Sequence, residues 1–467
     1  MNKYINFDHH MMENFCWPLL FSMLALCFCG LLNLYSLSSH ANFGNEWSWF
    51  ARQALYMGLA CGGLAAALFI DYQYLKKFIW PLYIFGVICL VAVYLPVVGS
   101  SANNAARWID LHVLRFQPSE IVKVITVITL AAWLAKRDQP SGLGFSDLLI
   151  PLGIIALPFI LILRQPDLGT ALHLLATCLP IFLVFRFRAH VVISVLTVGV
   201  LTAGLAISLL ASGSWTTLLD KGLDKGIVKQ HQVNRIETFI DPNKDPLDKG
   251  WQILQSLNTV GGGQLFGRGF KQGTQHKNGF MSEAETDFAF AVLAEEWGFV
   301  GCAVVLSLFL SLLTSSLMLA RRSKDRFGSL MVLGLTSMLF WQVVINVGMV
   351  IGLLPVVGIP LPFVSYGGTS MVVTIAAIAL MLNIGMRRYQ FKEDPVRENP
   401  YVWRHTSEVR TLVTVPIRRL AEDTPFNPEI HPSYRLPHVR PWAKYLRKGR
   451  SSMSGWQSPD PFESLED

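Results

Sequence analysis

The feature that most constrains this fold is a series of about ten apolar runs, most of them long enough to cross a bilayer as a helix. Only 15% of the 467 residues are charged, whereas soluble proteins carry about 25%. Because a spanning segment must satisfy its backbone hydrogen bonds internally, we expect an all-α polytopic membrane protein. The expected spans are Phe15–Ser36, Phe50–Ile70, Phe78–Leu95, Ser119–Leu134, Leu148–Leu163, Ala171–Phe185, Val191–Leu210, Phe288–Ala320, Phe327–Leu354 and Thr369–Met386.

Basic residues in the short connections predict the orientation. They gather on one side of the predicted bundle, at positions 76–77, 136–137, 186–188 and 321–326. This side is predicted to be cytoplasmic, and an even number of spans places both termini there. The first run lacks a following cleavage site, so we interpret it as a retained helix. The outer side carries the long 211–287 loop before the eighth span, and there we expect the functional chemistry.

The composition changes after Met386. Residues 389–467 are polar and Pro-rich with mixed charge, which predicts a largely disordered cytoplasmic tail behind a membrane domain of residues 1–388. The net charge of +7 does not indicate a nucleic-acid partner, because Lys and Arg lie in the loops and the tail. The seven cysteines lie in or beside apolar runs without metal-ligand or disulfide spacing. No metal site is indicated, and a role for a divalent cation stays open.

Ionisable residues inside or between the spans are the first candidates for a site. Glu120 and Lys123 share one face of the fourth span and can form an ion pair. Such residues usually face the bundle interior or a polar cavity, and a purely structural pair is the alternative. Arg164 and Asp167 either pair with each other or line the same outer cavity. The spans on either side of them look short for a bilayer, which suggests broken or tilted helices.

Asp287 is the strongest single candidate. An acidic, polar run ends there, and the eighth span begins at Phe288. A carboxylate at this boundary is only partly solvated, which makes it a stronger base. A helix N-cap is the alternative role, since Asp is favoured at that position.

Two Gly-rich outer loops accompany these candidates. The long loop contains glycines that allow tight turns or close approach to a ligand, at positions 261, 262, 263, 267 and 269. The segment 251–257 is amphipathic and suits a membrane surface. The last outer loop, 354–370, has three prolines and a Gly pair and includes Ser365. Irregular backbone of this kind lines a cavity or is buried in protein.

Several strings together resemble the SEDS family (shape, elongation, division and sporulation proteins). They are ARW at 106–108, FQPSE at 116–120 followed by Lys123, QPDLGT at 165–170, DPNKDPLDKGW at 241–251, TDFAFAVLAEEWGFVG at 286–301 and LPFVSYGG at 361–368. The string DPL before Gly250-Trp251, and GTQ at 273–275, are more similar to the RodA (elongation) branch than to the FtsW (division) branch.

The resemblance implies a peptidoglycan glycosyltransferase that polymerises lipid II into glycan strands for cell elongation and rod shape. It implies an outward-facing site in the bacterial cytoplasmic (inner) membrane. The implied partners are lipid II, a class B penicillin-binding protein acting as transpeptidase, other membrane proteins of the elongation complex, and membrane lipid.

The resemblance also implies roles for named residues. Asp287 matches the family's essential Asp and is the implied catalytic base. It implicates Arg107, Trp108, Glu120 and Lys123 in substrate binding. Three further substrate-binding candidates, Asp167, Arg52 and Ser365, follow from their places at an outer helix end or in an outer loop. Among all these candidates, Arg107 and Lys123 are expected to hold the pyrophosphate, with Glu120 orienting Lys123. The chain departs from the family pattern at Glu285, where a His is usual, at Gly279, where a Glu is common, and at Asn104 and Ala106 before the Arg-Trp pair.

Other function classes fit part of the pattern. A lipid II flippase or another transporter also has many spans and intramembrane charge, and a non-catalytic scaffold for a penicillin-binding protein is a third class. A division-type polymerase is the nearest alternative within the family. The charged candidates cluster at outer helix ends and not at the midplane, which favours the enzyme.

Overall fold

The computed structural model describes residues 13–39, 48–95, 99–102, 105–110, 115–137, 144–165, 167–185, 250–275, 280–281 and 283–387, with a few single positions between 193 and 238. The predicted seventh span, the predicted tail and most of the long outer loop lie outside these ranges, as do Asn104 and Gly279.

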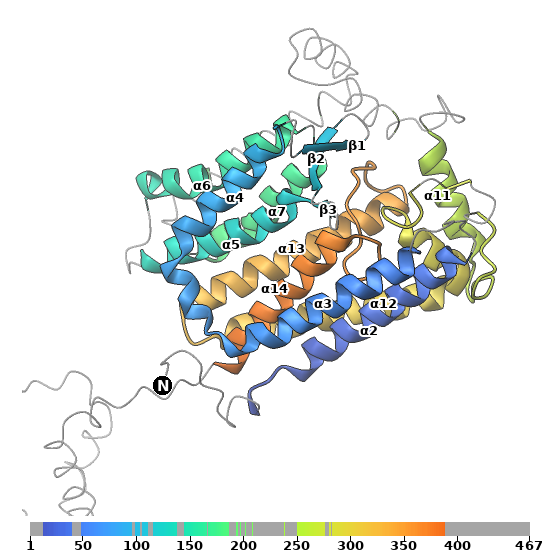
Figure 1. Cartoon of the computed structure of the whole chain (residues 1–467), viewed down its shortest axis with the longest axis horizontal. Coiled ribbons are helices and arrows are strands. Elements are labelled where there is room, and N and C mark those ends of the chain that lie inside the picture. Colours follow the sequence, from blue (N-terminus) through green and yellow to red (C-terminus); the bar gives the residue numbers. More distant parts are fainter. Residues whose placement is uncertain are drawn as a thin grey trace, which may run out of the picture. The chain divides into compact units, whose positions relative to one another are not determined.

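The described part is a bundle of helices, as predicted (Figure 1). The helices are α2 (Trp17–Ser38), α3 (Trp49–Phe69), α4 (Ile79–Ala92), α5 (Pro118–Lys136), α6 (Phe145–Arg164), α7 (Leu168–Val184), α11 (Trp251–Gly262), α12 (Ala289–Arg322), α13 (Arg326–Val350) and α14 (Gly368–Met386), with a 3₁₀ helix η1 (Tyr72–Lys77). In this part of the chain, α2, α5, α6, α12, α13 and α14 are long and apolar enough to cross a membrane. The chain is therefore an all-α multi-pass membrane protein.

Helix α13 lies at the centre of the bundle and contacts α5, α7, α11, α12 and α14 (Figure 1). Its apolar residues are not confined to one stripe, and buried side chains occur on every face from Phe327 to Val350. A helix that is apolar all round is stable when neighbours cover it on all sides. Helix α13 is therefore the element against which the others are placed.

Several helix bounds differ from the sequence predictions, and those of α6 and α13 change the interpretation. Helix α6 has 20 residues and is long enough to span, with Pro151 and Pro158 inside it, so the prediction that it is short was wrong. Helix α7, with 17 residues, is short as predicted. Helix α13 stops at Val350 and not at Leu354. Gly352 there adopts a φ of +73°, and the Leu353 amide donates to the Gly348 carbonyl over 2.8 Å, which is how a left-handed residue ends a helix.

A small antiparallel sheet between α4 and α5 was not predicted. Its strands β1 (Gly99–Ala102), β2 (Ala105–Asp110) and β3 (Arg115–Phe116) lie in the order β1-β2-β3, and Ile109 pairs with Phe116. The sheet lies against α5 and α14. The Gln117 amide donates to Thr369 Oγ1 over 3.2 Å, which joins the start of α5 to the start of α14.

Helix α12 is broken at Gly298, where φ is +65° and ψ is −166°. The loop that follows α11 fills the break, and the backbones of Gly267 and Gly298 touch. Amides and carbonyls freed by the break are paired across it, through Arg268 N to Glu295 O (2.9 Å), Gly269 N to Glu296 O (3.0 Å), Phe299 N to Gln264 O (2.9 Å) and Val300 N to Leu265 O (3.1 Å). Gly263 and Gly267 thus allow a close approach to the backbone of α12. The sequence prediction for these glycines was tight turns or close approach to a ligand, and it did not include this contact.

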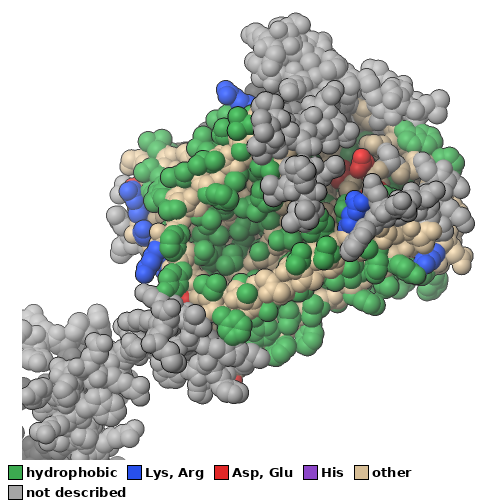
Figure 2. Space-filling model, in the orientation of Figure 1, with side chains coloured by type: hydrophobic (Ala, Val, Ile, Leu, Met, Phe, Trp, Pro, Cys, Tyr) green, Lys and Arg blue, Asp and Glu red, His purple; other side chains and the backbone are tan. Residues whose placement is uncertain are grey.

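The predicted cytoplasmic end is fastened by Asp325, the N-cap of α13. Its carboxylate accepts hydrogen bonds from Tyr72 Oη (2.6 Å), Lys76 Nζ (2.8 Å) and Gln73 Nε2 (3.1 Å). Burial alone raises the pKa of Asp325, but these three donors outweigh it and hold the pKa below its usual value. Figure 2 shows Lys and Arg side chains gathered at the left end of the bundle, beside the long apolar flank.

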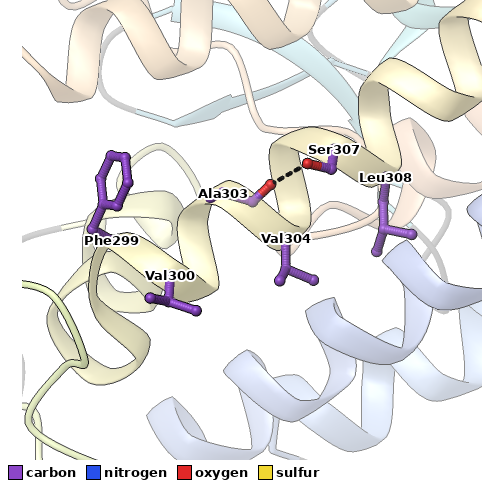
Figure 3. Close-up of a pocket in the computed structure, with 6 residues that line it drawn as sticks. All are labelled: Phe299, Val300, Ala303, Val304, Ser307 and Leu308. Atoms are coloured by element: carbon purple, nitrogen blue, oxygen red, sulfur yellow. Dashed lines mark hydrogen bonds between the residues drawn. The ribbon is translucent and has the colours of Figure 1, made fainter.

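An apolar groove runs along α12 beyond its break (Figure 3). Its lining residues are Phe299, Val300, Ala303, Val304, Ser307 and Leu308. The Ser307 hydroxyl donates to the Ala303 carbonyl over 2.7 Å, so the one polar side chain of the lining is satisfied within its own helix. None of the predicted site residues lines this groove.

Candidate functional site

Asp287 lies in a tight turn, 283–288, that leads into α12. The amides of Thr286, Asp287 and Phe288 all donate to the Glu283 carbonyl, at 3.1–3.2 Å, and Glu283 adopts a positive φ of 56°. The N-cap of α12 is Phe288. Asp287 therefore stands one residue before the cap, and its interpretation as the N-cap is wrong. Its side chain is half-buried, the environment expected of a carboxylate that acts as a base.

The backbone around Asp287 is held by two neighbours far away in the sequence. Asn346 Nδ2, from α13, donates to the Asp287 carbonyl (3.0 Å) and to the Ile359 carbonyl (2.8 Å). The Tyr366 amide donates to the Glu285 carbonyl over 2.7 Å. The turn is thus fixed by main-chain and amide contacts to residues 351–367 between α13 and α14, which include most of the predicted last outer loop (354–370).

Gly358 brings this outer loop directly against the candidate base. A Cβ atom at position 358 would lie 3.3 Å from Asp287 Oδ2, and Gly358 adopts a φ of +74°. Only glycine takes such a conformation without strain. The loop therefore approaches the carboxylate with bare backbone.

Ser365 stabilises the same loop through a hydrogen bond inside it. Its Oγ accepts a hydrogen bond from the Leu361 amide (2.9 Å), and the side chain is buried. Gln53 of α3 makes two hydrogen bonds to the backbone of this loop. Its Nε2 donates to the Ser365 carbonyl and its Oε1 accepts from the Gly367 amide, each at 3.2 Å. Ser365 thus lies in the loop that carries Gly358, and its hydroxyl is engaged in a hydrogen bond within that loop.

Asp167 is the N-cap of α7. Its carboxylate accepts from the Thr170 amide (3.2 Å) and the Thr170 hydroxyl (2.8 Å). Both of these contacts of the buried carboxylate are therefore with its own helix, and neither is with Arg164. A Cβ at Gly169 would lie 2.6 Å from the Val357 carbonyl, so the start of α7 abuts the loop that carries Gly358.

Glu120 and Lys123 form the predicted ion pair, with 2.7 Å between Lys123 Nζ and Glu120 Oε1. The ammonium also lies 3.1 Å from Nδ1 of His173 in α7, and the imidazole Nε2 lies 2.9 Å from the Met338 carbonyl of α13. Lys123 is only 1% exposed. The pair thus belongs to a buried network that joins α5, α7 and α13.

The remaining predicted residues lie in α3 and in the small sheet. Arg52 is in the first turn of α3 and is half-buried. Arg107 and Trp108 are neighbours in β2. The Trp108 side chain is half-buried, whereas the Arg107 side chain lies outside the described part of the structure.

Sequence reasoning missed the side chains that hold the site together. Gln53, His173 and Asn346 are buried polar residues inside apolar helices, and Asn33 of α2 is another, whose Nδ2 donates to the Ala289 carbonyl at the start of α12 (2.9 Å). The available signal was their polarity, because a polar side chain inside a span must find a partner. Within the described ranges, no group of three His, Cys, Asp or Glu side chains could hold a metal ion.

Replacing Asn346 by Leu is expected to lower the activity of the folded protein tenfold or more, because the part-buried carbonyl of Asp287 and the buried carbonyl of Ile359 lose their donor. Asn383 offers a matched control. It makes comparable bonds at the opposite end, to the Ala67 and Ile70 carbonyls. Asn383→Leu should lower the melting temperature while keeping the rate per folded molecule. Equal specific activities of the two variants would contradict this role of Asn346.

Comparison with known proteins agrees with the sequence strings. The family model of the FtsW/RodA/SpoVE cell cycle proteins matches residues 17–390. The chain belongs to this family, the SEDS family. The probable peptidoglycan glycosyltransferase FtsW of Geobacter sp. (strain M18) is 34% identical over 375 residues, 79% of this chain and 96% of that protein.

Two further relatives complete the comparison. The peptidoglycan glycosyltransferase MrdB of Escherichia coli (strain K12) is 38% identical over 307 residues, 66% of this chain and 77% of that protein. A chain from a solved peptidoglycan synthase complex has a TM-score of 0.64 at 29% identity and covers 80% of this chain and 99% of its own length. These similarities assign the chain to the peptidoglycan glycosyltransferases of the SEDS family.

Within the SEDS site, Glu285 occupies the position where the resemblance leads us to expect a His. Its side chain is half-buried, and burial raises the pKa of Glu285, with a smaller contribution from the charge of Glu283. Its backbone carbonyl accepts from Tyr366. This departure therefore leaves the main-chain contact with the outer loop in place.

Proposed function

We propose that this SEDS glycosyltransferase polymerises lipid II into glycan strands at the outer face of the bacterial cytoplasmic membrane, as the elongation-type enzyme of a rod-shaped cell. The observation that carries the proposal is the placement of Asp287. Its half-buried carboxylate faces the bare backbone of Gly358, and its main chain is fixed by Asn346. A base held in this way keeps its position during the reaction.

Asp287 is the proposed general base. It takes the proton of the 4-hydroxyl of the acceptor GlcNAc unit as that oxygen forms the new bond to the donor's anomeric carbon. The bond from this carbon to the pyrophosphate breaks, and polyprenyl pyrophosphate leaves with the electron pair. Base assistance of this kind accelerates transfer about 10²–10⁴-fold.

Cations near the outer helix ends are proposed to stabilise the leaving pyrophosphate. Arg107 and Lys123 are the main candidates, and Arg52 is the third. Glu120 fixes one N–H of Lys123. Trp108 offers a flat, half-buried surface for sugar or isoprenoid packing. Asp167 and Ser365 support the substrate site by shaping the helix end and the loop around Gly358, as their contacts indicate.

A class B penicillin-binding protein is the proposed partner. The support is the similarity to a chain of a solved synthase complex in which polymerization and crosslinking are coordinated. Membrane lipid and other proteins of the elongation complex are the further proposed partners. The identity of this chain to the FtsW relative (34%) and to the MrdB relative (38%) is too similar to separate the two subtypes. The proposed elongation role therefore rests on the strings DPL at 245–247 and GTQ at 273–275. We further propose that residues 389–467 form a cytoplasmic tail.

The deciding experiment is glycan polymerisation by the purified chain with its cognate transpeptidase, whose crosslinking activity is blocked by a β-lactam. Products from lipid II are separated on a gel, and a mock purification from the same host controls for contaminating polymerases. Polymer above the mock level is the expected result. Absence of polymer, together with movement of fluorescent lipid II across liposomes, would instead favour a transporter. Restoration of rod shape in cells depleted of their elongation polymerase tests the subtype.

A further inference from the structure

His173 is a buried ionisable residue to which the proposed function gives no role. It lies in α7 with no exposed surface and faces two other helices. Its Nδ1 lies 3.1 Å from Lys123 Nζ of α5, and its Nε2 lies 2.9 Å from the Met338 carbonyl of α13. Both ring nitrogens are therefore engaged.

The two partners assign the tautomer of His173. The Met338 carbonyl can only accept a hydrogen bond, so Nε2 carries the hydrogen and donates it. Nδ1 of the neutral ring then offers a lone pair and accepts from the Lys123 ammonium. A doubly protonated ring would direct a second N–H at that ammonium, an arrangement of like charges that a buried site disfavours.

We propose that His173 positions Lys123 for the pyrophosphate of the lipid-linked donor. Glu120 and His173 together engage two of the three N–H donors of the ammonium. Among the described residues, the third N–H has no acceptor. With two donors fixed, the third points in one direction, which suits an anionic phosphate oxygen. This inference rests on the proposed role of Lys123 in pyrophosphate binding.

Fixing a lysine in advance has a physical advantage. A free lysine side chain has rotamer entropy, which is lost when it binds a ligand. In this structure the neighbours of Lys123 have already restricted it before substrate arrives. Preorganised charge of this kind favours the transition state because nothing has to reorganise as charge develops.

The network also relates the cation to the candidate base. Met338, which anchors His173, and Asn346, which anchors Asp287, both belong to α13. They are eight residues apart, or about 12 Å along a helix. A single buried helix therefore sets the spacing between Lys123 and Asp287, the two groups proposed to act on opposite sides of the bond that breaks.

Three substitutions at position 173 separate the two hydrogen bonds of the ring. His173→Asn keeps an acceptor oxygen close to the Nδ1 position. His173→Gln keeps a donor close to the Nε2 position, and His173→Phe keeps the volume but neither hydrogen bond. Each purified variant, in complex with its transpeptidase, is assayed for kcat and KM with lipid II. Inhibition by added polyprenyl pyrophosphate measures binding of the leaving group without turnover, and the melting temperature reports stability.

If His173 positions Lys123, the Gln and Phe variants should lose about tenfold in kcat/KM and in affinity for polyprenyl pyrophosphate, the effect of one lost hydrogen bond to a charged group. The Asn variant should recover most of both, even where its melting temperature falls. The opposite order, with Gln active and Asn impaired in step with stability, would show that the ring only ties α7 to α13.

The outcomes also separate this inference from the proposed function. Polymer from the wild type with equal kcat/KM and equal inhibition in all three variants would overturn the role of His173 alone. A wild type that makes no polymer and does not bind polyprenyl pyrophosphate would overturn the proposed function, and the positioning role with it.

Discussion

Asp287→Asn is expected to lower the rate of glycan polymerisation about 10²–10⁴-fold, because the amide cannot accept the proton of the attacking hydroxyl. The substitution is nearly isosteric. The contacts that fix this turn, from Asn346 and Tyr366, are made to the carbonyls of Asp287 and Glu285 and not to the Asp287 side chain. The variant should therefore keep its melting temperature and its transpeptidase partner while losing product on the gel.

Glu283→Gln is the matched control for this experiment. Glu283 lies in the same turn, and its substitution by Gln also removes one negative charge. Its side chain is exposed, and its contribution to the turn comes from its backbone carbonyl, which the substitution keeps. The control should keep activity within about twofold, as surface substitutions usually have small effects. Full turnover by Asp287→Asn, with the mock preparation inactive, would exclude Asp287 as the base.

The spans were predictable because membrane helices are long and apolar. Helix α14 begins and ends within one residue of its prediction, since Gly367-Gly368 and Arg387 mark its ends. The break at Gly298 was not predictable by the same argument. The predicted span runs through Glu295, Glu296 and Gly298 to Ala320 without a predicted stop, and the break exists because residues 264–269 pair with it across the fold. A partner contributed by a distant loop leaves no trace in the local hydropathy.

Among the site residues too, some are visible in the local sequence and others depend on distant partners. Asp287 and the Glu120–Lys123 pair stand out in sequence as charges beside or within apolar runs, and the pair is present at 2.7 Å. The side chains that orient them do not stand out. His173 and Asn346 act through partners more than 50 positions away or on other helices, so their geometry depends on how α13 packs. The alternative role of Asp287 as an N-cap was wrong for a smaller reason, because the turn at 283–288 displaces the helix start by one residue.

Gly298→Ala is expected to cause the largest loss of stability. Its φ of +65° with ψ of −166° is a conformation reserved for glycine. A Cβ there would also meet the Gly267 backbone and lie 2.7 Å from the Leu265 carbonyl. Strain and overlap together should cost about 3 kcal/mol or more. The expected result is a strongly lowered melting temperature in detergent and little monodisperse protein on size-exclusion chromatography.

Gly261→Ala is the matched control, because Gly261 lies in α11 and a Cβ there meets nothing within 4 Å. It should be neutral or stabilising by up to about 1 kcal/mol, the difference in helix propensity. The contrast has a functional meaning. The break separates the buried first part of α12, which starts beside Asp287, from the longer part, which can span a membrane. Gly298 therefore sets the direction of the short helix at whose start the candidate base lies. If Gly298→Ala kept the stability of the control, a continuous α12 would be compatible with this fold, and the pairing of residues 264–269 across the break would not be needed to place Asp287.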